Sequence, residues 1–168
     1  MSDRQLLIEK LNAGRGELLA SLQGLTDEQA RIRPAEGAWS PLECVEHLAT
    51  VETLFLRRLQ TQSVDVPEEM SREREPVLYA RIATRDRKIV GPEIVQPKGR
   101  FASVNEAVEA FGQARAHTLQ WLQDCPHDLR RRAAEHPALG PGSVYEMVLI
   151  LAAHAARHAA QIRECRTA

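Results

Sequence analysis

Apolar residues recur at helical spacing in four long stretches of the chain. These stretches are residues 3–23, 41–62, 103–123 and 143–166. At or directly before the start of each of the last three stands a serine that is followed three residues later by a glutamate, which is the signature of a capping box: Ser40 and Glu43, Ser103 and Glu106, Ser143 and Glu146. A weaker signal of the same kind, from Thr26 to Gln29, predicts a short helical turn. The pattern therefore predicts four long helices.

The segments between these stretches have a weaker pattern. Residues 63–100 are charged and interrupted by proline and glycine, with a short helix expected at 77–87, and residues 125–142 are expected to form a loop. No segment shows the sustained two-residue alternation of a strand. A connection as long as 63–100 lets the second and third helices run parallel. The sequence therefore predicts an all-α fold, a four-helix bundle with a long crossover, in a single domain over residues 1–168.

Composition narrows the class of protein. With 43% apolar and 27% charged residues and a net charge of −1, the chain is typical of a globular protein without a field that favours nucleic acid. It has neither a signal-peptide pattern nor an apolar run long enough to cross a membrane, so a cytoplasmic location is expected. The three cysteines form no C-x-x-C pair, and we interpret them as small buried residues.

Two histidines on the fourth helix are the first candidates for chemistry. His154 and His158 are four residues apart, so both rings leave the same side of the helix, which they share with apolar residues. Buried imidazoles need a partner, and a divalent metal would serve both. His47 on the second helix is the best third ligand, and the rings would meet if both helices begin at the same end of the bundle. His117 on the third helix is the alternative, whereas His127 and His136 are expected to be solvated or turn residues.

Each of these residues also has a simpler interpretation. Buried histidines are often hydrogen-bonded core residues, and a pair at this spacing can arise by chance. Glu43 can be a capping-box acceptor only, or it can orient His47 or act as a catalytic base, because the two share one helix face. Arg157 and Gln161 fit either the helix surface or the rim of a pocket.

Two segments, WSPLECVEHL at 39–48 and HAARHAAQI at 154–162, resemble the DinB/YfiT-like family of metal-dependent proteins. Shorter matches at 97–101 and 136–140 occur in the expected order. The resemblance implies an up-down-down-up bundle, a homodimer, and a divalent metal, zinc or nickel, bound by His47, His154 and His158. It also implies an activity such as transfer of a low-molecular-weight thiol, because some members of the family are thiol S-transferases.

Two functions from different classes follow. The first is a metal-dependent enzyme that acts on a small-molecule substrate as a thiol S-transferase or hydrolase, with Glu43 as a speculative base. The second is a non-catalytic, metal- or ligand-binding stress-response module. A third hypothesis, nucleic-acid binding by the arginines of residues 72–88, is disfavoured because acidic residues interleave with them. Neither a nucleic-acid nor a membrane partner is expected.

Overall fold

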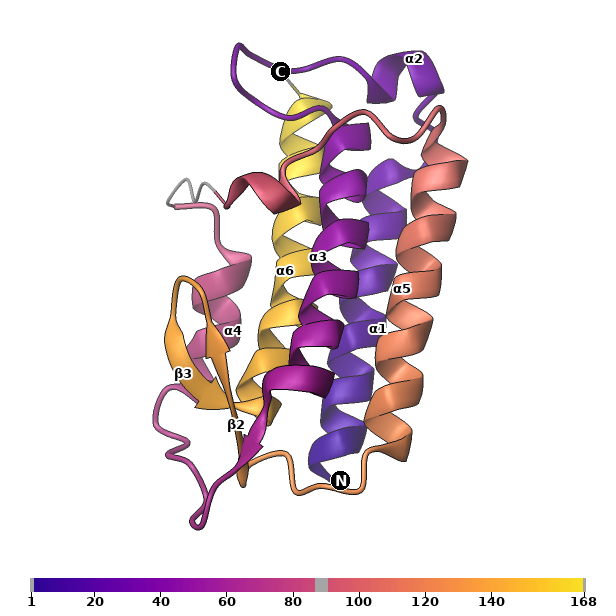
Figure 1. The fold of residues 1–168 in the computed structure, drawn as a ribbon. Helices are drawn as coiled ribbons and strands as arrows, with labels where there is room; N and C mark the ends of the chain where they lie inside the picture. Colours follow the sequence, from indigo (N-terminus) through magenta and orange to yellow (C-terminus); the bar gives the residue numbers. More distant parts are fainter. Residues whose placement is uncertain (1, 87–90, 168) are drawn as a thin grey trace.

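The computed structural model describes residues 2–86 and 91–167 and confirms the four-helix bundle (Figure 1). In Figure 1, α1 rises, α3 and α5 descend, and α6 rises again, so that the chain ends at the top of the bundle. The four long helices are α1 (Asp3–Leu22), α3 (Pro41–Gln62), α5 (Val104–Asp124) and α6 (Val144–Cys165).

The capping signals of the sequence mark the true helix starts. Ser40 and Ser143 each accept a hydrogen bond from the backbone N–H three residues on, and the carboxylates of Glu43 and Glu146 accept from the serine N–H in return. The predicted short turn is the helix α2 (Asp27–Ala30), capped by Thr26. These local bonds satisfy backbone donors that a helix start otherwise leaves without partners.

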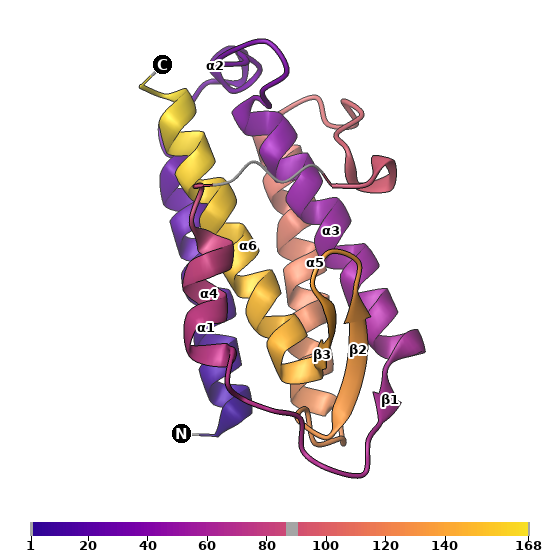
Figure 2. The same cartoon turned by 90° about the vertical axis from the view of Figure 1, so that its left-hand side faces the viewer.

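The long connection between α3 and α5 contains three short elements. They are β1 (Val64–Asp65), the helix α4 (Glu75–Ala83) and the 3-10 helix η1 (Glu93–Val95). The short helix thus begins two residues earlier than expected and ends at Ala83, whereas the predicted end at Arg87 lies outside the described residues. Figure 2 shows α4 lying against α6, on the side away from α3.

The expectation of a strand-free loop at 125–142 is wrong. This segment contains β2 (Arg132–His136) and all but the last residue of β3 (Gly140–Ser143), an antiparallel hairpin to which β1 adds a third strand. The sequence gives no alternation here because only Ala134, Gly142 and Ser143 of the two strands are buried. The hairpin packs on the lower parts of α3 and α6 and separates them there (Figure 2).

Helix α6 lies at the centre of the molecule and is covered by α1, α3, α4 and the hairpin. This position explains why α6 is apolar on nearly every side. Its closest neighbour is α1, where a Cβ on Gly14 would lie 2.7 Å from the carbonyl oxygen of Ala152. Only glycine allows this approach. Within the described residues, no helix combines the length and the apolar character that a membrane span requires.

A buried ion pair ties three of the long helices together. The Arg115 guanidinium on α5 donates to both carboxylate oxygens of Glu52 on α3, at 2.7 and 3.1 Å, and also to the Leu11 carbonyl on α1. Arg115 and Glu52 are 1% and 2% exposed. Because the charges and donors are matched, the pair is tolerated inside the core.

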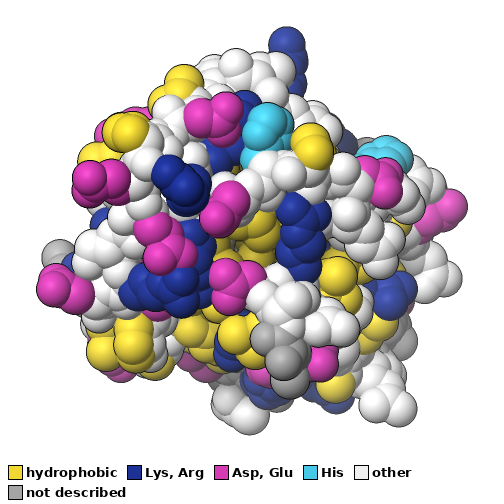
Figure 3. Space-filling model, turned by 90° about the horizontal axis from the view of Figure 1, so that it is seen from below, with side chains coloured by type: hydrophobic (Ala, Val, Ile, Leu, Met, Phe, Trp, Pro, Cys, Tyr) yellow, Lys and Arg dark blue, Asp and Glu magenta, His cyan; other side chains and the backbone are white. Residues whose placement is uncertain are grey.

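At the lower end of the bundle, basic and acidic side chains are interspersed (Figure 3). Arg130 bonds to Asp3 and Glu75 and lies over the Tyr145 ring, which joins the start of α1 to α4 and α6. Arg72, Arg74 and Arg85 of the 72–88 run are also paired within the chain, with Glu69, Glu146 and Glu164 respectively. These side chains therefore serve the fold.

Candidate metal centre

Three imidazole rings converge between α3 and α6. Nε2 of His154 lies 3.3 Å from Nε2 of His47 and 3.0 Å from Nε2 of His158. One nitrogen from each ring lies within 4.8 Å of the others, the separation expected of ligands to one ion. The structure thus brings together all three histidines that the sequence singled out.

The rings meet for a different reason from the one expected. Helices α3 and α6 begin at opposite ends of the bundle (Figure 1). His47 lies near the start of α3, whereas His154 lies at the middle of α6 and His158 one turn further toward its end. Because the two helices are antiparallel, these positions fall at the same height, in the upper half of the bundle.

The outer nitrogens of two rings are held by oxygen atoms. Nδ1 of His47 lies 2.7 Å from the carbonyl oxygen of Val95 in η1, and Nδ1 of His158 lies 2.9 Å from Oε1 of Gln161. Oxygens of this kind only accept hydrogen bonds, so each Nδ1 carries the ring hydrogen. In a neutral ring, Nε2 then has a free lone pair, and both lone pairs point toward His154.

The centre fits a cation better than a set of hydrogen bonds. If neutral His154 carries its hydrogen on Nε2, it can donate to His47 or to His158, and the lone pair of the other ring is left without a donor from His154. A cation would be a partner for that lone pair. Nitrogens that are about 2.0–2.1 Å from a tetrahedral ion are separated by about 3.3 Å, close to the two observed distances.

Burial keeps the three rings neutral. It lowers the pKa of His47, and it places the pKa values of His154 and His158 well below the ordinary range, where the other imidazoles add to the effect. His47 and His158 are each 5% exposed, and His154 is partly exposed. The Trp39 ring lies 4.6 Å from the His47 ring and stacks on His158 at 5.9 Å, which makes an apolar wall. Neutral imidazoles are the form that binds metals.

A buried carboxylate beside His47 holds the loop that carries Val95. Glu46 is 2% exposed and accepts the backbone N–H groups of Lys98, Gly99 and Arg100 at 2.7, 3.0 and 3.1 Å. It also accepts a bond from Nε of Arg100 at 3.2 Å. Glu46 thereby fixes the chain that follows η1. Sequence reasoning overlooked it, although an acidic residue next to His47 on a largely apolar helix is a visible signal.

The remaining candidate histidines lie elsewhere. His117 is exposed on α5, which removes the alternative third ligand, and His127 is exposed near Asp65. Nδ1 of His136 accepts the N–H groups of Ala138 and Leu139, so it is a turn residue of the hairpin.

Glu43 contacts its own helix start and a nearby arginine. Its carboxylate accepts from the Ser40 N–H at 2.8 Å and from Nε of Arg33 at 2.9 Å. Burial alone would raise the pKa of Glu43, but the Arg33 and Ser40 bonds outweigh it and the pKa is lowered. The role of orienting His47 falls to the Val95 carbonyl instead. A role for Glu43 as a base stays a prediction.

The three cysteines are free, and burial raises the pKa of Cys44 and of Cys165. A raised pKa disfavours the reactive thiolate. The interpretation as buried residues is confirmed for Cys44 and Cys125, whereas Cys165 is only partly buried.

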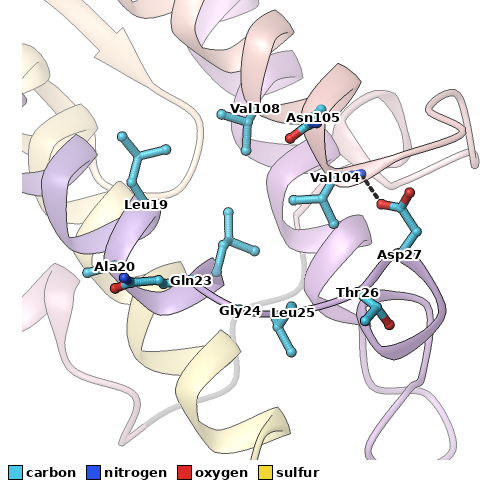
Figure 4. Close-up of a pocket in the computed structure, with 11 residues that line it drawn as sticks. Leu19, Ala20, Gln23, Gly24, Leu25, Thr26, Asp27, Val104, Asn105 and Val108 are labelled. Carbon is cyan, nitrogen blue, oxygen red and sulfur yellow. Dashed lines mark hydrogen bonds between the residues drawn. The ribbon is translucent and has the colours of Figure 1, made fainter.

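A separate cavity of about 650 Å³ lies at the upper end of the bundle (Figure 4). It is bounded by the end of α1, residues 24–27 and the first turn of α5, with Leu19, Leu25, Val104 and Val108 as aliphatic lining. Asp27 in its wall accepts a bond from the Val104 N–H at 2.8 Å. None of the three clustered histidines is among the described residues that line it.

Comparison with known proteins gives a consistent result. The DinB superfamily matches residues 10–162 of the chain. Among solved structures, the chain is similar to TT2238, a four-helix bundle protein, with a TM-score of 0.58 and 22% identity over 98% of both chains. It is also similar to YfiT from Bacillus subtilis, described as a probable metal-dependent hydrolase with an unusual four-helix bundle topology. For YfiT the TM-score is 0.64 and the identity 16%, over 99% of this chain and 89% of that one.

A conserved protein from Enterococcus faecalis aligns with a TM-score of 0.69 and 15% identity, over 99% of this chain and 96% of that one. No curated protein matches the sequence. The structural likenesses support the fold of the chain.

Proposed function

The chain belongs to the DinB superfamily, and from this premise we propose that it is a divalent-metal-dependent enzyme that acts on a small molecule as a thiol S-transferase or hydrolase. The observation that carries the proposal is the pair of Nε2 lone pairs directed at His154. The metal ligands are His47, His154 and His158. The description of YfiT as a probable metal-dependent hydrolase supports the same class of function.

Three neutral imidazoles give an ion three of the four ligands of a tetrahedral site and leave a position for water or a thiol. When bound there, zinc or nickel would act as a Lewis acid and lower the pKa of that fourth ligand. The chain itself orients the rings through Val95 and Gln161, and Trp39 excludes water from one side. We further propose a small-molecule substrate, a homodimer and a cytoplasmic location, as the family resemblance and the sequence lead us to expect.

Metal titration of the chelator-treated protein tests this function. We expect one Zn²⁺ or Ni²⁺ per chain, and a loss of affinity of at least a hundredfold in His154→Ala, because one of three ligands is removed. His117→Ala is the matched control, since this exposed histidine lies on α5, away from the cluster. Consumption of a low-molecular-weight thiol with a generic electrophile, and hydrolysis of a generic ester, are then followed with and without metal.

Turnover that depends on the metal supports the enzyme, and the reaction that is accelerated separates transferase from hydrolase. Turnover that is equal with and without metal, or absent for every thiol and ester, contradicts the proposed activity. The absence of metal binding contradicts the centre itself.

The burial of the centre favours a second candidate function, a non-catalytic metal- or ligand-binding module. Two of its three histidines are only 5% exposed, and Trp39 stacks on one of them. Cobalt substitution distinguishes the two functions. A spectrum that changes when a thiol is added indicates an exchangeable ligand position, whereas an unchanged spectrum with a complete protein shell favours the module.

A further inference from the structure

The side-chain amide of Gln161 lies between two hydrogen-bond donors. Its Oε1 is 2.9 Å from Nδ1 of His158 and 3.0 Å from Nη1 of Arg85, which follows the end of α4. Gln161 is one turn after His158 on α6, so the contact with the ring is local. The contact with Arg85 joins two segments that are far apart in the sequence.

Arg85 fixes the orientation of the Gln161 side-chain amide. A guanidinium group only donates hydrogen bonds, so the amide oxygen must face it, and the NH₂ group would be repelled. The same oxygen then faces Nδ1 of His158, which must donate. Arg85 is itself held by Glu164, since its Nε lies 2.9 Å from both carboxylate oxygens. Because Glu164 is 58% exposed, we assign this ion pair to orientation more than to stability.

We infer that Arg85 and Gln161 are positioning residues that lock His158 in the tautomer whose Nε2 is free to bind a metal. The metal-binding part of this inference rests on the proposed function, whereas the tautomer can be observed in the metal-free protein. His47 needs no such lock, because its partner is the Val95 carbonyl and a carbonyl cannot turn round. The side-chain amide of Gln161 can rotate, and Arg85 prevents this rotation.

The tautomer of each histidine can be read from long-range proton–nitrogen NMR spectra of the metal-free, ¹⁵N-labelled protein at pH 7.5. In the unsubstituted protein, His158 should carry its hydrogen on Nδ1. In Arg85→Met the amide is free to turn, its NH₂ can donate to Nδ1, and the other tautomer should appear. Zn²⁺ affinity should fall about tenfold, the lower end of the effect of removing an outer partner of a ligand.

Two further variants separate orientation from general damage. Gln161→Glu, added to Arg85→Met, should restore the Nδ1–H tautomer, because both oxygens of a carboxylate accept and rotation changes nothing. Arg81→Met is the matched control, an exposed arginine one turn earlier on α4, and should leave tautomer and affinity unchanged. Arg85→Lys retains a donor and should keep the tautomer, even if removal of the whole guanidinium disturbs folding.

The inference is overturned if His158 keeps the Nδ1–H tautomer in Arg85→Met, or if Gln161→Glu does not restore it. Either result leaves the proposed function standing as long as the unsubstituted protein binds Zn²⁺. Conversely, if that protein binds no metal but the tautomer follows the amide as described, the proposed function fails and the positioning role remains.

Discussion

Replacing Glu46 with glutamine should weaken both the fold and the metal centre. Each carboxylate oxygen of Glu46 accepts two hydrogen bonds: Oε1 from the Lys98 N–H and from Nε of Arg100, Oε2 from the N–H groups of Gly99 and Arg100. In Glu46→Gln, an NH₂ group replaces one oxygen and meets two donors instead of accepting from them. The positive φ of 71° at Gly99 brings these successive N–H groups to one place.

The magnitude follows from those bonds. Hydrogen bonds to a charged group contribute roughly 1.5–3 kcal/mol each, so two lost bonds correspond to about 3–6 kcal/mol. Arg100 is 50% exposed, and the loop can move toward water and recover part of that loss. We therefore expect the free energy of unfolding to fall by about 2–4 kcal/mol. The loop directly follows Val95, whose carbonyl oxygen orients the His47 ring. Loss of the loop's hydrogen bonds should therefore also lower Zn²⁺ affinity about tenfold.

Urea denaturation of the metal-free protein, followed by circular dichroism, measures the first effect, and Zn²⁺ titration measures the second. Glu109→Gln is the control, an exposed glutamate on α5 whose loss should change stability by less than about 0.5 kcal/mol. A similarly small change in Glu46→Gln would refute the argument that two of the four hydrogen bonds to the Glu46 carboxylate are lost. A large loss of stability with unchanged Zn²⁺ affinity would show that Glu46 does not act on His47 through Val95.

Two further predictions concern helix packing and pH. Gly14→Ala should destabilise the fold by about 1–3 kcal/mol, because the new methyl group meets the Ala152 carbonyl. Gly16→Ala should stabilise it by up to about 1 kcal/mol, because a Cβ there meets no neighbouring atom and alanine favours a helix. Thermal denaturation of both variants measures these effects, and equal effects would contradict the close contact between α1 and α6. The pKa values of His154 and His158 are lowered in the folded protein, so below about pH 6.5 the unfolded chain binds more protons than the folded one. The free energy of unfolding of the metal-free protein should therefore fall by up to about 1.4 kcal/mol per ring and pH unit as the pH decreases toward 5. Urea titrations at pH 7.5 and 5.5 measure the loss, and a stability that is constant over this range would contradict the buried neutral rings.

The long helices could be predicted from the sequence because their signals are local. A capping serine and the glutamate three residues later contact each other whatever the rest of the chain does, and this fixes the starts of α3 and α6. The pairing of His154 with His158 is equally local, since four residues separate neighbours on one helix face. His47 could be chosen because it is the one histidine on the second helix.

Other features depend on contacts that leave no local pattern. The hairpin of β2 and β3 is held by backbone bonds and by its neighbours, so residues such as Pro141 and Gly142 give no strand periodicity. Val95 acts through its carbonyl oxygen, which every residue possesses. Arg85 lies in a run of alternating charges, where nothing distinguishes it from its neighbours until the fold places it against Gln161.

The candidate metal centre and the ion pairs that join the lower ends of the helices lie in different parts of the bundle. The three histidines and their outer partners lie in the upper half, whereas the ion pairs of Arg130 with Asp3 and Glu75 lie at the lower end, where α1 begins (Figure 1). Substitutions at the lower end can then accumulate, or be engineered for heat resistance, without touching the ligands. Conversely, a new specificity can be selected near Trp39 while the lower end continues to secure the scaffold.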